Sequence, residues 1–302
     1  MSNKYILFFL FLPIWIILGI LWIIVHLPKR FRIWLGKSLG KFLYLFPSSP
    51  KRITYQNLQL CFPEWTDEER KKLAKENFAS LGLAVIETMM AWALPDEKLK
   101  NLYQLYGKEH ALNALQKGKG IIFIAPHFTC IEIIGRLLGM HYQFGVMYKP
   151  HKKPYFSYIH KRFRKKHYST YIPSNRVREL FHALSQNLPI WYAYDVDGGL
   201  KRSSVFAPFF GIPASTLTTV SRFARISGAS VLPLSYFRRD DNSGYDIIIS
   251  PSLENFPSDN LYEDAVRLNS VLESAIRQKP SQYIWQYKRF KTRQPGEKRF
   301  YT

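Results

Sequence analysis

Cysteine and acidic side chains are scarce in this chain of 302 residues, which has two of the former and 22 of the latter. Cys61 and Cys130 do not stand in a CxxC or metal-ligand spacing, so no metal site or disulfide framework is indicated. We expect both thiols to be reduced in a cytosolic compartment. Because 43 lysine and arginine residues give a formal net charge of +21, the partner is predicted to be negative: nucleic acid, an anionic membrane surface or an acidic protein.

Charged residues are absent from residues 5–27, YILFFLFLPIWIILGILWIIVHL. About 20 apolar residues suffice to cross a bilayer as a helix, so residues 1–28 are predicted to be a transmembrane anchor. A cleaved signal peptide would need a shorter apolar stretch and a small-residue cleavage site, and neither is present. Basic residues mostly follow the segment, and the positive-inside rule therefore places the chain after Pro28 on the cytoplasmic side. Residues 29–65 are basic and aromatic, which favours a helix at the membrane surface followed by a Pro-Ser turn.

The remainder, residues 66–302, alternates short apolar runs with helical patterns. Thr66 and Glu69 form a capping box that begins a helix reaching Leu94. Strands are predicted at 121–126, 144–148, 190–195, 230–237 and 245–250, and helices near 130–140, 155–167, 176–187, 215–227 and 260–279. Such alternation predicts one α/β domain with a largely parallel central sheet.

The segment GIIFIAPHFTCIEIIGRLLG carries the first candidate chemistry. His127 follows a strand that ends at Pro126, and Glu132 lies five residues on, about 140° around a continuous helix. The two side chains can meet only if His127 lies in the turn and folds back over the first helical turn. A carboxylate there would accept the Nδ1–H and leave Nε2 as a base. A histidine that merely satisfies its own hydrogen bonds after a strand is the competing interpretation.

Several ordered motifs favour the catalytic interpretation. His127-x4-Glu132 resembles the HX4(D/E) motif of the glycerolipid and lipid A acyltransferases, a part of the lysophospholipid acyltransferase superfamily. Further segments resemble the late (secondary) lipid A biosynthesis acyltransferases: Tyr148-Lys149-Pro150, Arg162-Phe163-Arg164, Tyr194-Asp195-Val196-Asp197-Gly198, residues 202–211 and residues 283–297. The likeness covers nearly the whole chain. Lys149 stands where arginine is common, and Gln286-Tyr287 where Val-His is frequent.

The resemblance implies a glycerol-3-phosphate-acyltransferase-like layer fold over residues 66–302, with a mixed, mostly parallel sheet. It implies transfer of laurate or myristate from acyl carrier protein, or from acyl-CoA, to a 3-hydroxyacyl hydroxyl of an anionic, Kdo-bearing lipid A precursor. The enzyme would need no cofactor or metal and would sit as a single-pass protein in the bacterial inner membrane, facing the cytoplasm. His127 would be the base, Glu132 its orienting acid and Arg164 the donor to the oxyanion. Substrate would be bound by Lys149, Arg162, Asp195, Asp197 and Arg202.

Other functions remain open at this point. An acyl-cysteine route through Cys130 would need an activating base. Asp195 and Asp197 without a third ligand are weak evidence for a metal, and we expect them to organise a loop and pair with arginines such as Arg202. A membrane-anchored esterase or thioesterase, or an acyltransferase acting on another anionic lipid such as a lysophospholipid, could use the same His-acid pair. Nothing in the sequence resembles a nucleic-acid motif, so a nucleic-acid partner is not expected.

Overall fold

The computed structural model describes residues 12–150, 154–164 and 166–301. Its central sheet has seven strands in the order β1-β9-β8-β2-β5-β3-β4. Their bounds are β1 Tyr103–Tyr106, β2 Ile121–Ala125, β3 Gly145–Tyr148, β4 Thr170–Pro173, β5 Pro189–Ala193, β8 Ser230–Arg238 and β9 Tyr245–Ile249. A separate two-stranded sheet contains β6, Ser204–Phe209, and β7, Ile212–Leu217.

Most of the strand pairs in the central sheet are parallel. β2 runs parallel to both β5 and β8, and β3 runs parallel to β4 and β5. The β8–β9 pair is antiparallel and reverses the direction of the sheet edge, where β1 pairs with β9 in parallel. The predicted α/β fold with a mixed, mostly parallel sheet is confirmed.

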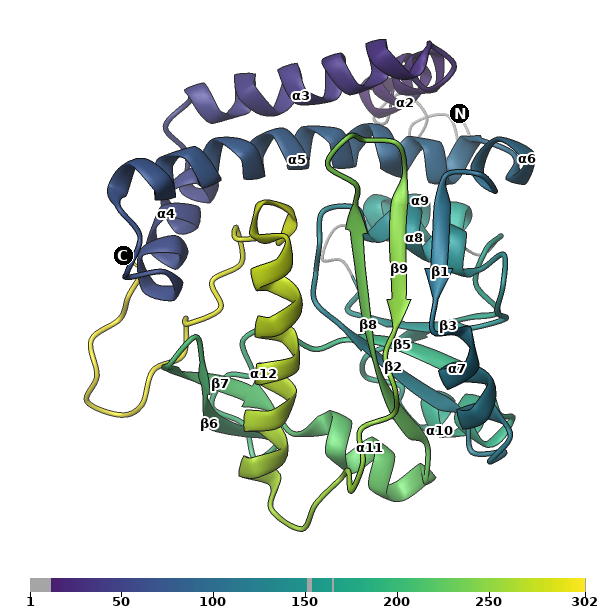
Figure 1. The fold of residues 1–302 in the computed structure, drawn as a ribbon, viewed down its shortest axis with the longest axis vertical. Coiled ribbons are helices and arrows are strands. Elements are labelled where there is room, and N and C mark those ends of the chain that lie inside the picture. The colour runs from purple at the N-terminus through teal and green to yellow at the C-terminus, as the bar shows by residue number, and fades with distance from the viewer. Residues whose placement is uncertain (1–11, 151–153, 165, 302) are drawn as a thin grey trace, which may run out of the picture.

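Helices cover the sheet and form a layer at one end of it (Figure 1). Their bounds are α2 Leu12–Val25, α3 Lys29–Leu45, α4 Ser49–Cys61, α5 Asp67–Ala93, α6 Asp96–Leu99, α7 Lys108–Leu115, α8 Ile131–Leu138, α9 Pro154–Arg164, α10 Val177–Ser185, α11 Thr219–Ser227 and α12 Leu261–Gln278, with a 3-10 turn η1 at Pro280–Gln282. The long helix α5 begins at the predicted capping box, in which Glu69 N donates to Thr66 Oγ1 over 3.2 Å.

Helices α3 and α5 lie against each other along much of their length (Figure 1). Glycines allow this approach, because a Cβ on Gly82 of α5 would stand 2.1 Å from the carbonyl oxygen of Gly36 on α3. A Cβ on Gly40 would likewise stand 2.0 Å from the carbonyl oxygen of Phe78. The segment predicted to lie at the membrane surface is therefore also packed on the helix that supports the sheet.

The predicted transmembrane helix is not supported by the structure. Of the predicted segment, residues 12–27 are described, and residues 12–25 of these form the helix α2. Within residues 12–150, 154–164 and 166–301, no helix combines the length and apolarity needed to cross a membrane, and residues 5–11 of the predicted segment lie outside these ranges.

Several short elements differ from the sequence predictions. The helix predicted before the Pro-Ser turn is α3, which ends where the chain becomes extended at Phe46. The helix α4 after that turn was not predicted, and Ser48 caps it by accepting from Lys51 N over 3.4 Å. The helix predicted at 215–227 begins only at Thr219, since β7 occupies residues 212–217. The strands β1, β4, β6 and β7 were not predicted.

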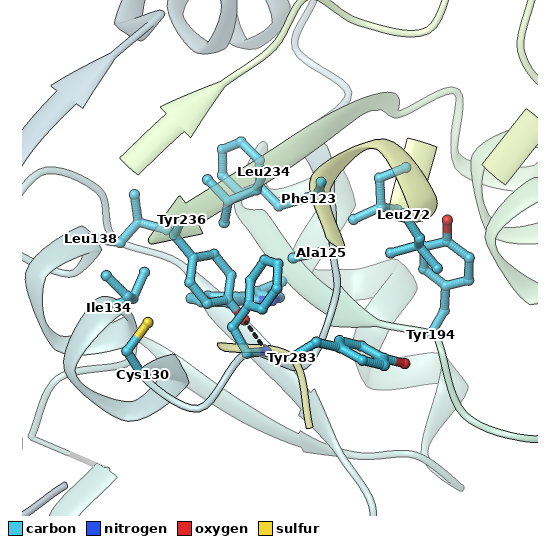
Figure 2. Close-up of a cluster of buried hydrophobic side chains, with 14 of the residues drawn as sticks. Phe123, Ala125, Cys130, Ile134, Leu138, Tyr194, Leu234, Tyr236, Leu272 and Tyr283 are labelled. Carbon is cyan, nitrogen blue, oxygen red and sulfur yellow. Dashed lines mark hydrogen bonds between the residues drawn. The ribbon is translucent and has the colours of Figure 1, made fainter. Parts of the chain in front are cut away.

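A buried apolar cluster lies between the sheet and the helices. Figure 2 shows Phe123 and Ala125 of β2 together with Leu234 and Tyr236 of β8, and with Cys130 and Ile134 at the start of α8. All of these side chains are buried. The core therefore reaches the turn that carries His127, so this turn stands on closely packed side chains.

Candidate active site

His127 and Asp195 meet because they follow neighbouring parallel strands. Ala125, the last residue of β2, pairs with Ala193, the last residue of β5, and each polar residue comes two positions later. Asp195 is 1% exposed; its Oδ2 accepts from His127 N over 2.8 Å, and its Oδ1 contacts His127 Nδ1. One carboxylate therefore fixes both the backbone and the ring of His127. In the described part of the chain, Nε2 has no hydrogen-bond partner and is the nitrogen left for a substrate.

The turn around His127 is held by its backbone on both sides. Tyr236 donates from its hydroxyl to the carbonyl oxygen of Pro126 over 2.6 Å, and the same hydroxyl accepts from Phe128 N over 3.4 Å. The carbonyl oxygen of His127 accepts from Ile284 N over 2.9 Å. These bonds determine the direction of the imidazole before any substrate binds, which is the preorganisation that general base catalysis needs.

The electrostatics of this pair favour a charged imidazole. Burial alone would lower the pKa of His127, but the negative charge of Asp195 and the hydrogen bond to it outweigh burial, so the pKa of His127 is raised. Burial would likewise raise the pKa of Asp195, yet the charge and the hydrogen bonds of His127 lower it. Asp195 is thus held as a carboxylate that can stabilise an imidazolium at His127.

Glu132 and Arg164 form a second pair. Arg164 Nε donates to Glu132 Oε2 over 3.2 Å, and Arg164 Nη2 contacts Glu132 Oε1. The side chains of Arg164 and Glu132 are 19% and 11% exposed, so this is a mostly buried ion pair. Trp92 of α5 donates from Nε1 to Glu132 Oε2 over 3.4 Å, and Arg164 Nη1 donates to the Tyr171 hydroxyl over 2.7 Å.

The structure thus differs from the expectation that Glu132 accepts the Nδ1–H of His127. That position is taken by Asp195, while Glu132 faces Arg164. The reason is geometric: Glu132 lies in the first turn of α8, whereas Asp195 reaches His127 from the end of the adjacent strand. The three predicted catalytic residues belong to two different pairs, and their catalytic roles stay predictions.

The comparison with protein families identifies the family of the whole chain. Residues 6–292 match the model of the bacterial lipid A biosynthesis acyltransferase family. The chain belongs to this family. The palmitoleoyltransferase of lipid A biosynthesis from Escherichia coli K12 is 35% identical over 95% of this chain and 94% of its own length. The lauroyltransferase of lipid A biosynthesis from the same organism is 34% identical over 93% of this chain and 92% of its own length. The myristoyltransferase of lipid A biosynthesis is 26% identical over 89% of this chain and 84% of its own length. The protein is therefore an acyltransferase of lipid A biosynthesis.

The predicted substrate-binding residues of this lipid A acyltransferase lie on several different elements. Lys149, Arg162 and Arg202 are exposed, on the segment after β3, on α9 and before β6 respectively. Asp197 accepts from Thr292 N over 3.1 Å and from Thr292 Oγ1 over 2.8 Å. In the structure as described, neither Asp195 nor Asp197 forms an ion pair with Arg202, so that expected pairing is wrong. Within the same described ranges, no group of three or more His, Cys, Asp or Glu residues could hold a metal ion.

Cys130 is unsuited to a covalent route. Its side chain is 1% exposed, and burial raises its pKa to about 12. Its sulfur lies 3.9 Å from Gln282 Oε1, inside the core shown in Figure 2. A thiol with this pKa is protonated at neutral pH and is not a nucleophile. The burial and the raised pKa of Cys130 therefore argue against the acyl-cysteine route.

Sequence reasoning did not assign a role to several aromatic side chains at the site. Trp92, which donates to Glu132, stacks on Phe163 with ring centroids 4.6 Å apart. Tyr171, which accepts from Arg164, stacks on Tyr148 with ring centroids 3.6 Å apart. Tyr287 packs against His127 with ring centroids 5.4 Å apart. Tyr148, Phe163 and Tyr287 lie within or beside segments that resemble the family motifs, and this was an available signal.

Proposed function

We propose that this chain transfers laurate or myristate from acyl carrier protein to the 3-hydroxyacyl hydroxyl of a Kdo-bearing lipid A precursor. The observation that carries the proposal is the His127–Asp195 pair at the carboxyl ends of β2 and β5. In this pair a buried carboxylate holds Nδ1 and leaves Nε2 directed away from it. A base of this kind suits proton removal from an alcohol. The name of the E. coli palmitoleoyltransferase adds palmitoleate to the acyl chains that deserve testing.

The reaction proceeds in one displacement. His127 Nε2 removes the proton of the acceptor hydroxyl while the hydroxyl oxygen forms a bond to the thioester carbonyl carbon. The carbonyl π electrons move to oxygen, and when they return the C–S bond breaks. The imidazolium then gives its proton to the departing thiolate, so the base is regenerated and the products are an ester and a free thiol. Asp195 stabilises the imidazolium that exists between these two proton transfers.

Arg164 is our proposed donor to the oxyanion, with Glu132 holding it. Three of its N–H groups contact Glu132 and Tyr171. Because a guanidinium has five N–H groups, the others remain for a substrate oxygen. The ion pair fixes the guanidinium plane, and its partial burial strengthens any interaction with developing negative charge. Glu132 therefore acts on Arg164 in this scheme rather than on His127.

Apolar side chains exposed on α2 and α3 support the proposal that the protein binds at a membrane surface. On α3, Trp34 is 64% exposed, Phe31 59% and Leu45 73%, and on α2 Ile23 is 60% exposed. Arg30 of α3 is also exposed and would face anionic lipid. We propose that this face rests on the cytoplasmic surface of the bacterial inner membrane, where an amphipathic acceptor would be presented.

The function is tested with purified protein, a tetraacylated Kdo-bearing lipid A precursor, and laurate, myristate or palmitoleate loaded on acyl carrier protein or on coenzyme A. Mass spectrometry should show the gain of one acyl chain that is lost in His127→Ala. Transfer to a lysophospholipid but not to the lipid A precursor would overturn the acceptor. Release of free fatty acid without any acyl transfer would instead indicate the esterase or thioesterase alternative.

A further inference from the structure

A second concave site lies away from His127, between α3, α5 and the turn that joins β8 to β9. It is a cavity of about 670 Å³, and its lining includes Lys37 and Lys41 of α3, Lys75 of α5, and Ser80, Arg238 and Gln282 at its base. Figure 1 shows the β8–β9 turn in front of α5 and just below α3, which agrees with this lining. His127, Glu132 and Arg164 do not line it.

Three charged residues of the cavity lining are neutralised by ion pairs. Arg238 is neutralised by Glu87, with both nitrogen–oxygen distances at 2.6 Å, and Arg239 by Asp246 at 2.7 Å. Asp240, which also lines the cavity, is neutralised by Lys279 at 2.6 Å.

Three lysines and one acid of the lining are left after these pairs. Among the residues that the structure describes, Lys37, Lys41 and Lys75 form no ion pair, and neither does Glu76. The lining thus carries an excess of two positive charges. Lys37 and Lys41 are one helical turn apart, so they face the same side of α3 and repel each other when no anion is present.

A smaller adjoining cavity extends the positive charge. Its volume is about 60 Å³, and it shares Leu83, Arg238 and Asn242 with the first. Lys29 and Arg32 line it, and Arg32 Nε is buried without a hydrogen-bond partner in the described part of the chain. The Arg32 guanidinium is held beside this cavity, because its Nη1 donates to the carbonyl oxygen of Val25 over 3.3 Å.

We propose that this cavity is a binding site for a phosphate-bearing anion, separate from the reaction centre. Ammonium groups that converge from two helices suit a phosphate group, which accepts hydrogen bonds on several oxygens at once. An anionic phospholipid headgroup and a free phosphate share this chemistry. The exposed aromatic residues Trp34 and Phe42 on the same helix α3 favour the headgroup.

The base of the cavity is joined to the catalytic turn. Ser80 Oγ lies 2.7 Å from Thr129 Oγ1, and the carbonyl oxygen of Gln282 accepts from Thr129 N over 2.7 Å. Thr129 is two residues from His127. Ser80 and Gln282 therefore connect an anion bound in the cavity, through their hydrogen bonds to Thr129, with the turn that carries His127.

The test compares the full-length protein with two triple variants of equal charge. The cavity variant is Lys37→Gln/Lys41→Gln/Lys75→Gln. The control variant is Lys71→Gln/Lys72→Gln/Lys98→Gln, whose lysines are exposed and line neither cavity. Calorimetry measures binding of inorganic phosphate, and fluorescence titration measures binding of nonionic-detergent micelles that carry phosphatidylglycerol or phosphatidylcholine. Circular dichroism establishes that both variants are folded.

We expect the cavity variant to lose affinity while the control variant keeps it. Each lysine contributes about fivefold at an anionic surface, which gives about a hundredfold for three. Saturable phosphate binding that only the cavity variant loses means that a free anion suffices. A preference for phosphatidylglycerol that only the cavity variant loses identifies the lipid headgroup. Equal losses in both variants, or no saturable binding of either probe, overturn the site.

Discussion

Replacing Asp195 by asparagine tests which acid supports the base. The carboxylate accepts from both the backbone N–H and the ring of His127, and asparagine has only one acceptor oxygen for these two positions. If that oxygen keeps the backbone bond, the amide NH2 faces Nδ1 and drives the proton to Nε2, where it blocks the base. If the amide turns round, its NH2 faces the backbone N–H, and two donors are left opposed in a buried site.

The expected loss in kcat for Asp195→Asn is about 10³–10⁴-fold, or about 4–5.5 kcal/mol of transition-state stabilisation. This magnitude follows the effect of the same substitution in a Ser-His-Asp triad, where the wrong tautomer is also the cause. The matched control is Asp197→Asn, which alters the carboxylate that accepts from Thr292 and leaves His127 untouched. We expect a much smaller loss from this control.

The pH dependence gives an independent check on the same variant. Asp195 raises the pKa of His127, and a general base works only when it is deprotonated, so wild-type activity increases as the pH rises through that raised pKa. Without the carboxylate this pKa falls, and the residual activity of Asp195→Asn should reach its plateau at lower pH. Steady-state rates with purified, folded enzyme measure both quantities. The reasoning is refuted if Asp195→Asn stays within about threefold of wild type while Glu132→Gln shows the loss and the pH shift.

Three further substitutions probe the surroundings of the pair. Cys130→Ser should keep acyl transfer within a few-fold, because the thiol is protonated and takes no part; complete loss in a folded variant, seen by mass spectrometry, would favour the covalent route. Tyr171→Phe should lower kcat about tenfold with little change in KM by freeing Arg164, and an effect on KM alone would contradict this role. Glu87→Gln should lower the Tm by about 10 °C, because it leaves the charge of Arg238 buried and unpaired; an unchanged melting curve by circular dichroism would show that this network adds no stability.

The main elements of the sheet could be predicted because their apolar runs are long and bounded by turns. β2, with five buried residues in succession, and β8 were predicted within one or two residues. β1 and β4 have four residues each and little buried apolar surface, and β6 includes polar Ser204. Short strands of this kind gain their stability from neighbours, and the sequence does not record which neighbours they have.

The partner of His127 could not be predicted from the sequence for a related reason. His127 and Asp195 were both recognised at strand ends, but β2 and β5 become neighbours only through a strand order in which β3 and β4 lie outside them. Spacing along the chain suggested Glu132, five residues away, instead of Asp195, 68 residues away. The motif residues were thus found from the sequence, and their pairing required the fold.

The irregular C-terminal segment explains how the loops of this site are kept together. Ile284 N binds the carbonyl oxygen of His127, and Thr292 binds Asp197 in the loop after β5. Gln286 Nε2 donates to Thr54 Oγ1 and Asn77 Oδ1 over 2.9 and 2.8 Å, which ties the same segment to α4 and α5. Its neighbour Tyr287 lies against the His127 ring and is 43% exposed. Gln286-Tyr287 is the pair where Val-His is frequent in the family, and neither residue contacts Asp195 by hydrogen bond in the described structure. This departure therefore lies at the exposed side of the His127 ring, and the His127–Asp195 pair is formed without it.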